Sequence, residues 1–148
     1  MELDQKDLKI LETLKESSKL TVNKIGKRLR LPITTVHNRI KKLEKLGVIK
    51  NYTINPDYKK LGKDLLVYVQ VSVNYTTPTG EKLHQEDIAK KIKKLTDVEE
   101  VNIVAGVTDI LIKVRLENME ALNNFIIKKL REIPGVDKTQ TIVVMNQI

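Results

Sequence analysis

The excess positive charge of this chain is confined to its first 60 residues. Residues 1–60 contain fifteen Lys and Arg against seven Asp and Glu, whereas residues 61–148 contain twelve of each. A basic segment therefore precedes a neutral one, which favours two small domains over a single one in a chain of 148 residues. Residues 21–50 concentrate the charge, with nine Lys and Arg and one acid, Glu44. Such a stripe is typical of a surface that meets a polyanion, most often nucleic acid.

The basic segment has the spacing of a helix-turn-helix. Asp4 and Thr21 are expected to cap a first and a second helix, each with apolar residues at helical intervals. A break at residues 30–32 precedes a third helix that runs to about Leu46, and Gly47 stands where a left-handed residue often ends a helix. Two helices joined by so short a turn, with a helix before them, predict a helix-turn-helix domain. Residues 48–54 alternate loosely and predict a short strand, the wing of a winged domain.

One face of the third helix suits the major groove of DNA. At 100° per residue, Val36, Ile40 and Leu43 share the arc that faces the core. The opposite side carries amide, hydroxyl and cationic groups, which read base edges and hold phosphates. An RNA duplex hides its major groove, and RNA modules usually stack bases on aromatics, of which this segment has one, Tyr52. The side chains expected to contact DNA from this helix are Thr34, Thr35, His37, Asn38, Arg39, Lys41, Lys42 and Lys45.

Several of these cations also have a structural interpretation. Lys24, Lys27 and Arg28 on the second helix are expected to meet the DNA backbone, but a solubility surface explains them equally well. Arg39 lies beside the core arc, so an ion pair with an acid such as Asp7 is as consistent with its position as a phosphate contact. The sequence leaves both alternatives open.

The neutral segment predicts a βαββαβ order. Strands are expected at 65–73, 98–105, 110–116 and 136–145, with one helix marked by Ile88, Ile92 and Leu95 after a loop at 74–84 and another at 118–132. A pseudo-repeat supports this order, because Ile92-x-x-Leu95-x-x-Val98 recurs as Leu130-x-x-Ile133-x-x-Val136. Two such units make a ferredoxin-like fold. The expected α+β chain comprises a helix-turn-helix domain at 1–54, a linker at 55–63 and a ferredoxin-like domain at 64–148.

One face of the predicted sheet remains without helices. Leu66, Tyr68, Gln70 and Ser72 alternate with the valines of the first strand, so this face is not purely polar. A surface of this kind usually packs against a second copy of the chain. The sequence therefore predicts a dimer.

Other function classes lack their signatures. The chain has no Cys, no apolar run near the roughly 20 residues of a membrane span, and an acidic start unlike a signal peptide. His37 and His84 are the only histidines and neither has a ligand cluster nearby, so neither a metal nor a cofactor is expected. Phosphate-binding glycine loops and catalytic triads are also missing from the sequence. We expect a soluble, cytoplasmic protein that is not an enzyme.

Four motifs occur in order at the spacing of one regulator family. They are Leu3-Asp4-x-x-Asp7-x-x-Ile10-Leu11, Thr35-Val36-x-x-Arg39-Ile40-x-x-Leu43-Glu44-x-x-Gly47-Val48-Ile49, Gly106-x-x-Asp109 and Ile133-Pro134-Gly135-Val136. With them the chain resembles the Lrp/AsnC (leucine-responsive, feast/famine) transcription regulators over essentially its full length. The resemblance implies dimers formed through the ferredoxin-like domain, often assembled into tetramers or octamers. It also implies that an amino acid or other small effector binds near Gly106 and Asp109, although Gly and Asp are expected in any tight β-turn.

The chain departs from the family pattern at three places. Arg30 stands where the family usually has Gly, and is expected at a turn position that Gly tolerates better, where it adds a phosphate contact. Pro32 replaces the usual Ser, so the third helix lacks a capping hydroxyl. Val107 and Thr108 stand where the family often has an acid and an aromatic, which weighs against amino-acid sensing, and the loop at 74–84 is somewhat long.

Two alternatives share this architecture. An architectural protein would coat or wrap DNA through the same basic surface without choosing a sequence. A sirohaem-decarboxylase-like enzyme would need His or Arg residues around a tetrapyrrole pocket, and the second domain offers only His84, Arg115 and Arg131, which are not grouped in sequence. The leading hypothesis is a sequence-specific regulator that binds double-stranded DNA as a homo-oligomer.

Overall fold

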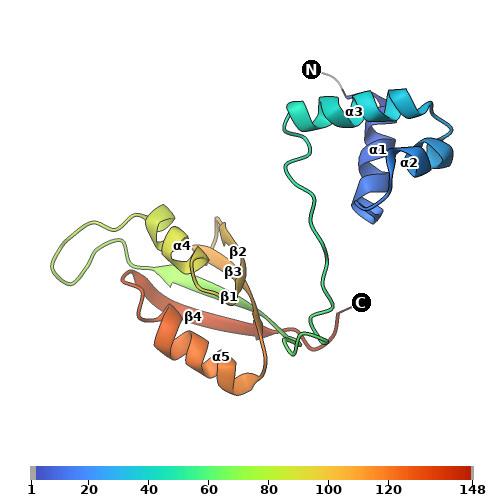
Figure 1. The fold of residues 1–148 in the computed structure, drawn as a ribbon. Coiled ribbons are helices and arrows are strands. Elements are labelled where there is room, and N and C mark those ends of the chain that lie inside the picture. The colour runs from blue at the N-terminus through green and yellow to red at the C-terminus, as the bar shows by residue number, and fades with distance from the viewer. Residues whose placement is uncertain (1–2, 148) are drawn as a thin grey trace. The chain divides into compact units, whose positions relative to one another are not determined.

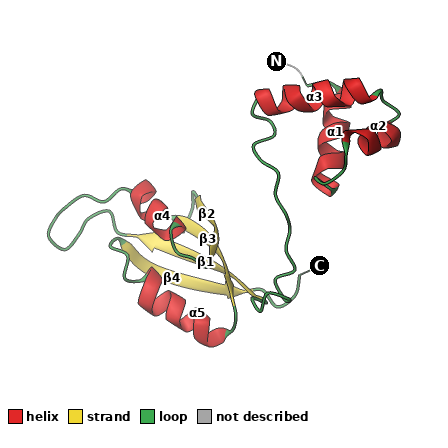
Figure 2. Ribbon diagram, in the orientation of Figure 1, coloured by secondary structure: helices red, strands yellow, loops and turns green. Residues whose placement is uncertain are grey.

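The computed structural model describes residues 3–147 and contains two compact units, Met1–Pro56 and Asp57–Ile148 (Figures 1 and 2). The first unit consists of the helices α1 (Gln5–Glu16), α2 (Val22–Leu29) and α3 (Ile33–Lys45). Each unit has a hydrophobic core of its own. No helix among the described residues has the length and apolarity needed to cross a membrane.

Two of the three helices of the first unit, α1 and α2, begin where their capping residues predict. The side chain of Asp4 accepts hydrogen bonds from the amides of Lys6 and Asp7, and the Asp7 carboxylate accepts one from the amide of Asp4, which forms a capping box. Thr21 accepts from the amide of Lys24 at the start of α2. These bonds satisfy amides that a helix leaves free in its first turn. The buried core between the helices consists of Ile10, Leu14, Ile25, Val36 and Leu43.

The turn between α2 and α3 contains the strained residue that the sequence predicts. Arg30 has φ 54° and ψ 44°, and it is the one residue other than glycine with a positive φ in the described part of the chain. A side chain in this left-handed conformation costs about 1–2 kcal/mol because its Cβ crowds the backbone. Pro32 precedes α3 and provides no side-chain cap, so this expectation is also confirmed.

Replacing Arg30 with Gly is expected to raise the free energy of unfolding of the first unit by about 1 kcal/mol. Glycine removes the left-handed strain, and the larger entropy of the unfolded chain offsets part of that gain. Urea unfolding measures the change. Arg30→Ala is the matched control because it removes the charge and keeps the strain. An equal response of both variants would contradict the conformational explanation.

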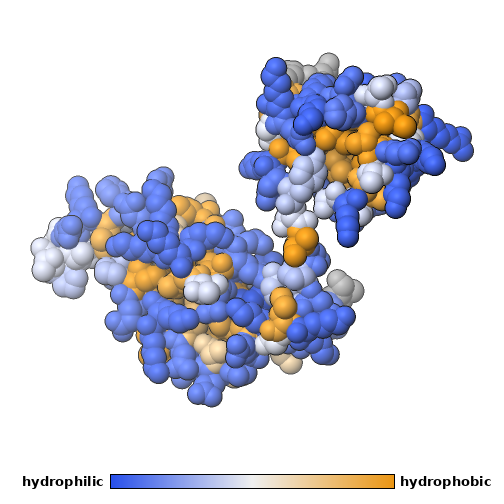
Figure 3. Space-filling view, in the orientation of Figure 1, coloured by the Kyte–Doolittle hydropathy of each residue, from blue (hydrophilic) through white to orange (hydrophobic). Residues whose placement is uncertain are grey.

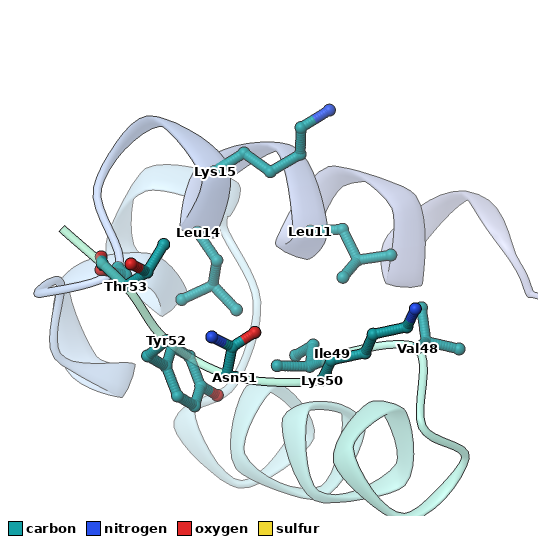
Figure 4. Close-up of a pocket in the computed structure, with 10 residues that line it drawn as sticks. Leu11, Leu14, Lys15, Val48, Ile49, Lys50, Asn51, Tyr52 and Thr53 are labelled. Carbon is teal, nitrogen blue, oxygen red and sulfur yellow. The ribbon is translucent and has the colours of Figure 1, made fainter. Parts of the chain in front are cut away.

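The strand predicted at 48–54 is absent, and this prediction is wrong. The amides of Val48 and Ile49 both donate back to the carbonyl of Leu43, which fastens the start of the segment to the end of α3. Among residues 3–147 no strand lies beside the segment, and a lone strand has no partner for its backbone groups. The segment instead runs past α1 and borders a cavity of about 600 Å3, into which Leu11 and Leu14 point (Figure 4).

The second unit has the predicted βαββαβ order. Its elements are β1 (Leu65–Val73), α4 (Gln85–Lys93), β2 (Val98–Ile103), β3 (Ile110–Leu116), α5 (Met119–Phe125), the π-helix η1 (Ile126–Leu130) and β4 (Val136–Val143). The strands pair antiparallel in the order β2-β3-β1-β4. Val67, Val69, Val71 and Val73 of β1 are buried with residues of both helices, so α4 and α5 cover the same face of the sheet. This is the expected α+β, ferredoxin-like arrangement.

The pseudo-repeat corresponds to a repeated turn at the end of each helical segment. Leu95 donates its amide to the carbonyl of Ile92, and Val98 donates to that of Leu95. The same pair of bonds joins Ile133 to Leu130 and Val136 to Ile133. Equal spacing of apolar residues therefore gives the same helix-to-strand connection twice.

The chain that precedes β1 is held against the second unit. The guanidinium carbon of Arg115 lies 4.2 Å from the centroid of the Tyr58 ring, and Arg115 also donates to Glu99. The Lys63 ammonium lies 3.3 Å from the Asp97 carboxylate. A cation over an aromatic ring and an ion pair both oppose the release of this segment.

Candidate nucleic-acid interface

The outward face of α3 is open to solvent and rich in hydrogen-bonding groups. Thr34, His37, Asn38, Lys41 and Lys45 are exposed, while Val36 and Leu43 on the opposite side are fully buried, as the helical angles predict. Asn38 makes no side-chain hydrogen bond within residues 3–147, so its amide is available to a ligand. A free amide on an exposed helix can pair with the edge of an adenine.

Four of the predicted DNA contacts meet at one place. Thr35, Asn38, Arg39 and Lys42 surround a shallow depression of about 360 Å3, with Asp4 of the α1 cap on its rim. The depression therefore combines amide, hydroxyl and cationic groups from α3 with a carboxylate from outside it. Asp4 is not among the residues predicted at this surface, and the Asp4-x-x-Asp7 motif is the signal in the sequence that points to it.

Arg39 and Lys42 are also structural. The Asp7 side chain has no exposed surface, and its two oxygens accept from Arg39 Nη1 at 2.7 Å and from Lys42 Nζ at 3.0 Å. Arg39 Nη1 donates a further bond of 2.6 Å to Asp4. Of the two interpretations of Arg39, the ion pair with Asp7 is present. The partner of Lys42 was not predicted.

These contacts favour the charged form of both acids. Burial alone raises the pKa of Asp7, but hydrogen bonds from Lys42 and Arg39 outweigh it, and the pKa lies below its ordinary value of 3.8. The pKa of Asp4 is also lowered, by the amide of Asp7 and by Arg39. The same bonds raise the pKa of Arg39. The α1–α3 contact is thus held together by charges that persist at neutral pH.

The first unit is expected to lose stability only below about pH 4. An acid whose pKa is lower in the folded state stabilises that state above its unfolded pKa, near 4, and the contribution is lost as the pH falls through the folded pKa. The urea midpoint should therefore be level from pH 7 to about 5 and fall below about pH 4. Asp7→Asn should flatten that fall. A midpoint that falls equally in this variant would assign the acid sensitivity to other carboxylates.

The remaining cations fall into two groups. Arg28 donates to Glu16, and Lys41 lies 3.6 Å from Glu44, which also accepts from the Tyr52 hydroxyl. Exposed pairs of this kind are weak and release readily to a phosphate. Of the cations predicted to contact DNA from α2 and α3, those with no ion pair among the described residues are Lys24, Lys27 and Lys45.

The Gly106-to-Asp109 turn is fixed by its own chain. The carboxylate of Asp109 accepts from the amide of Val73 at 2.8 Å and from the hydroxyl of Tyr75 at 2.9 Å. Its carbonyl accepts from the side chain of Gln85 at 2.7 Å. Gly106 has φ 142°, a conformation that favours glycine. These contacts give Asp109 a structural role, whereas Gly106 and Val107 are exposed.

Comparison with known proteins identifies the family. The model described as "Winged helix-turn-helix DNA-binding" matches residues 3–50, and the model described as "Lrp/AsnC ligand binding domain" matches residues 66–148. The chain belongs to the Lrp/AsnC family. An HTH-type transcriptional regulator of Pyrococcus furiosus is 43% identical to this Lrp/AsnC chain over 95% of its length and 91% of the relative. The HTH-type transcriptional regulator FL11 of Pyrococcus horikoshii is 34% identical over 97% and 89%.

Solved Lrp/AsnC structures agree with the whole fold. LrpC of Bacillus subtilis superposes with a TM-score of 0.85 at 32% identity, covering 100% of this chain and 98% of that one. The regulator NMB0573 of Neisseria meningitidis, in complex with L-Met, superposes with a TM-score of 0.90 at 26% identity, covering 99% and 92%. The protein is therefore a DNA-binding transcription regulator with a helix-turn-helix, and the predictions of its family and fold class are confirmed.

Proposed function

We propose that this protein controls transcription by binding particular sequences in double-stranded DNA as a homodimer or a larger homo-oligomer. The observation that carries the proposal is the free amide of Asn38 at the centre of an exposed, acid-poor helix face. Thr34 and Thr35 add hydroxyls that read either donors or acceptors on base edges. An α-helix of this size fits the major groove, so α3 is the reading element.

The backbone contacts come from the surrounding cations. Lys24, Lys27 and Lys45 are exposed and unpaired within the described residues, and each can neutralise a phosphate. Arg28 and Lys41 join them by exchanging a weak surface pair for a phosphate. Arg39 and Lys42 contact DNA while they remain anchored to Asp7, which fixes the direction in which their other donors point. Residues 1–54 form the DNA-binding domain, 55–63 the linker and 64–148 the oligomerisation and effector domain.

The uncovered face of the sheet is the proposed dimer surface. Tyr68 of β1 lies between Lys113 of β3 and Ile142 of β4, and the neighbouring Leu111 lies opposite Gln70. Tyr68 and Leu111 are half-buried, whereas Ile142 is exposed. An apolar patch with a polar rim suits a second copy. A twofold dimer requires a pseudo-palindromic site with half-sites about one helical turn, or multiples of it, apart.

An amino acid or similar small molecule is the proposed effector. Support comes from NMB0573, a full-length structural relative that binds L-Met. In this chain the carboxylate of Asp109 already accepts hydrogen bonds from Val73 and Tyr75, so an effector at this turn would meet the exposed residues Gly106 and Val107.

Selection of preferred sites from a random duplex library tests the proposal. Affinities for the selected and a scrambled duplex are then compared across a salt series. A palindromic consensus and a preference of roughly a thousandfold or more would support a specific regulator. A steep salt dependence with no preferred sequence would assign an architectural role instead. Absence of binding at low salt would reject both.

A further inference from the structure

Residues 57–63, which lie within the proposed linker, form a turn that is closed by hydrogen bonds at both ends. The side chain of Asp57 accepts from the amide of Lys60 at the start of the turn, as an N-cap does. At its end the amides of Gly62 and Lys63 donate back to carbonyls three and five residues earlier, with φ 70° at Gly62. This is the Schellman pattern that ends helices. The turn is therefore ordered by its own backbone.

The second unit holds this turn at two points. The ring of Tyr58 lies against the Arg115 guanidinium, whose carbon is 4.2 Å from the ring centroid. The Lys63 ammonium lies 3.3 Å from the carboxylate of Asp97, which also accepts from Lys129 at 2.9 Å. We call the contacts of Tyr58 and Lys63 with the second unit the clasp.

The two partners of the clasp are themselves fixed to the sheet. Arg115 is buried on β3, and its Nε donates to Glu99 of β2 at 3.2 Å. The amide of Arg115 donates to the carbonyl of Asp97, which joins the two partners to each other. Burial raises the pKa of Asp97, but Lys129 and Lys63 lower it by more, so this carboxylate is ionised at neutral pH. The clasp therefore attaches the turn to rigid parts of the second unit.

The first unit holds the chain almost as far as the turn. The hydroxyl of Tyr52 donates to Glu44, and the hydroxyl of Ser18 donates to the carbonyl of Thr53 at 3.3 Å. Three residues, 54–56, separate this last contact from the turn. Ile54 and Asn55 are exposed, and Figure 3 shows the connecting segment open to solvent.

The three connecting residues have little conformational freedom. The ring of Pro56 fixes its φ at about −65°, and Asn55, which precedes it, is restricted to extended conformations. Glycine and serine, which make linkers flexible, are absent from residues 54–56. An open clasp would instead leave the whole segment up to residue 64, just before β1, free to move. The freedom of the DNA-binding unit therefore depends on whether the clasp is closed.

We propose that Tyr58 and Lys63 are positioning residues for DNA recognition, because the closed clasp restricts the spacing between the two half-sites that a dimer can bind. The inference rests on the proposed binding of a dimer to a pseudo-palindromic site. Each added base pair moves a half-site by about 3.4 Å and turns it by about 35° around the helix axis. A dimer whose DNA-binding units have little freedom binds one spacing best.

The strength of the clasp limits this preference. Where the spacing is wrong by one or two base pairs, the dimer can open the clasp and let its units follow the half-sites. A cation–π contact and a partly exposed ion pair together change an equilibrium by about a factor of ten. The wrong spacing should therefore weaken binding by up to about tenfold.

A series of duplexes tests this inference on the full chain. Each duplex carries the two half-sites obtained by selection, with the spacer lengthened or shortened by one or two base pairs. The affinity of the wild-type chain should fall by up to about tenfold on either side of its best spacing. The double variant Tyr58→Ala/Lys63→Ala should give a nearly level profile. A change in stability alone would weaken binding at every spacing alike.

Two further variants complete the comparison. Lys59→Ala is the matched control, because it removes a cation from the same turn that has no ion pair among residues 3–147. Insertion of three glycines between Asn55 and Pro56 leaves the clasp in place and should also give a level profile, because it lengthens the free chain directly. Amide signals of β1–β4 show whether the second unit is folded in each variant. If the double variant is unfolded, Lys63→Ala alone takes its place.

Level profiles in the double variant and the insertion, with the wild-type profile kept in Lys59→Ala, would support the inference. A clasp variant that keeps the wild-type profile would overturn it, as would a wild-type chain that binds all spacings equally. Sequence-specific binding, and with it the proposed function, would stand in both cases. Absence of sequence-specific binding in the wild-type chain would reject the proposed function and this inference together.

Discussion

Replacing Asp7 with Ala is expected to lower the free energy of unfolding of the first unit by about 3 kcal/mol. The Asp7 side chain is fully buried and receives hydrogen bonds from Arg39, Lys42 and the amide of Asp4. Loss of one member of a buried ion pair typically costs 3–5 kcal/mol, and the lower end applies here because Arg39 and Lys42 reach solvent. A unit this small has only a few kcal/mol of stability, so the variant should be largely unfolded there.

Urea unfolding followed by amide signals of each unit measures this effect. The signals of α1–α3 should shift to lower urea, whereas those of β1–β4 should hold their midpoint, because each unit has its own core. Glu12→Ala is the matched control, since Glu12 is an exposed acid on the same helix without an ion pair among the described residues. Equal, small losses in both variants would show that the buried network contributes little.

The same residues show how far sequence reasoning reaches. Helix starts at Asp4 and Thr21 follow from local side-chain chemistry, and both caps are present. The Arg39–Asp7 pair was one of two alternatives, because a helical angle places Arg39 beside the core without saying what faces it. The bond from Lys42 to the same carboxylate depends on how α1 crosses α3, which is tertiary packing. Local rules therefore found the elements and the exposed face of α3, but not the contacts that fix the direction of its cations.

Apolar periodicity leaves two features of this fold undetermined: whether a segment finds a strand partner, and which kind of helix forms. The apolar alternation at 48–54 predicts a strand, but a strand forms only where another chain segment pairs with it. The helix predicted at 118–132 is present, and its second part, Ile126–Leu130, is a π-helix that directly follows α5 (Met119–Phe125). A π-turn keeps almost the same apolar residues inward, so Ile126 and Leu130 are buried as expected, and periodicity cannot distinguish the two forms. Whether a strand finds a partner, and whether a helical turn widens into a π-helix, depends on tertiary packing.

Replacing Asn38 with Ala is expected to weaken binding to the preferred DNA sequence roughly 5- to 150-fold, which corresponds to about 1–3 kcal/mol. The Asn38 side chain is exposed and makes no hydrogen bond within the described residues, so its removal should leave the stability of the first unit nearly unchanged. Binding to scrambled DNA should change little, because a base contact carries sequence information and a phosphate contact does not. Fluorescence anisotropy with both duplexes measures the two affinities.

The variant Lys45→Ala distinguishes a phosphate contact from a base contact on the same helix. Lys45 is exposed near the end of α3 and has no ion pair among the described residues, which suits a phosphate contact. Its removal should weaken specific and scrambled binding alike and reduce the slope of log affinity against log salt by about 0.9 for each phosphate lost. Opposite behaviour in the two variants, with Asn38 changing the preference and Lys45 changing the salt slope, would establish α3 as the reading helix. If Asn38→Ala instead weakens binding to both duplexes equally, Asn38 contacts the phosphate backbone of DNA. Base readout must then come from another residue, and Thr34 and Thr35 are the first to test.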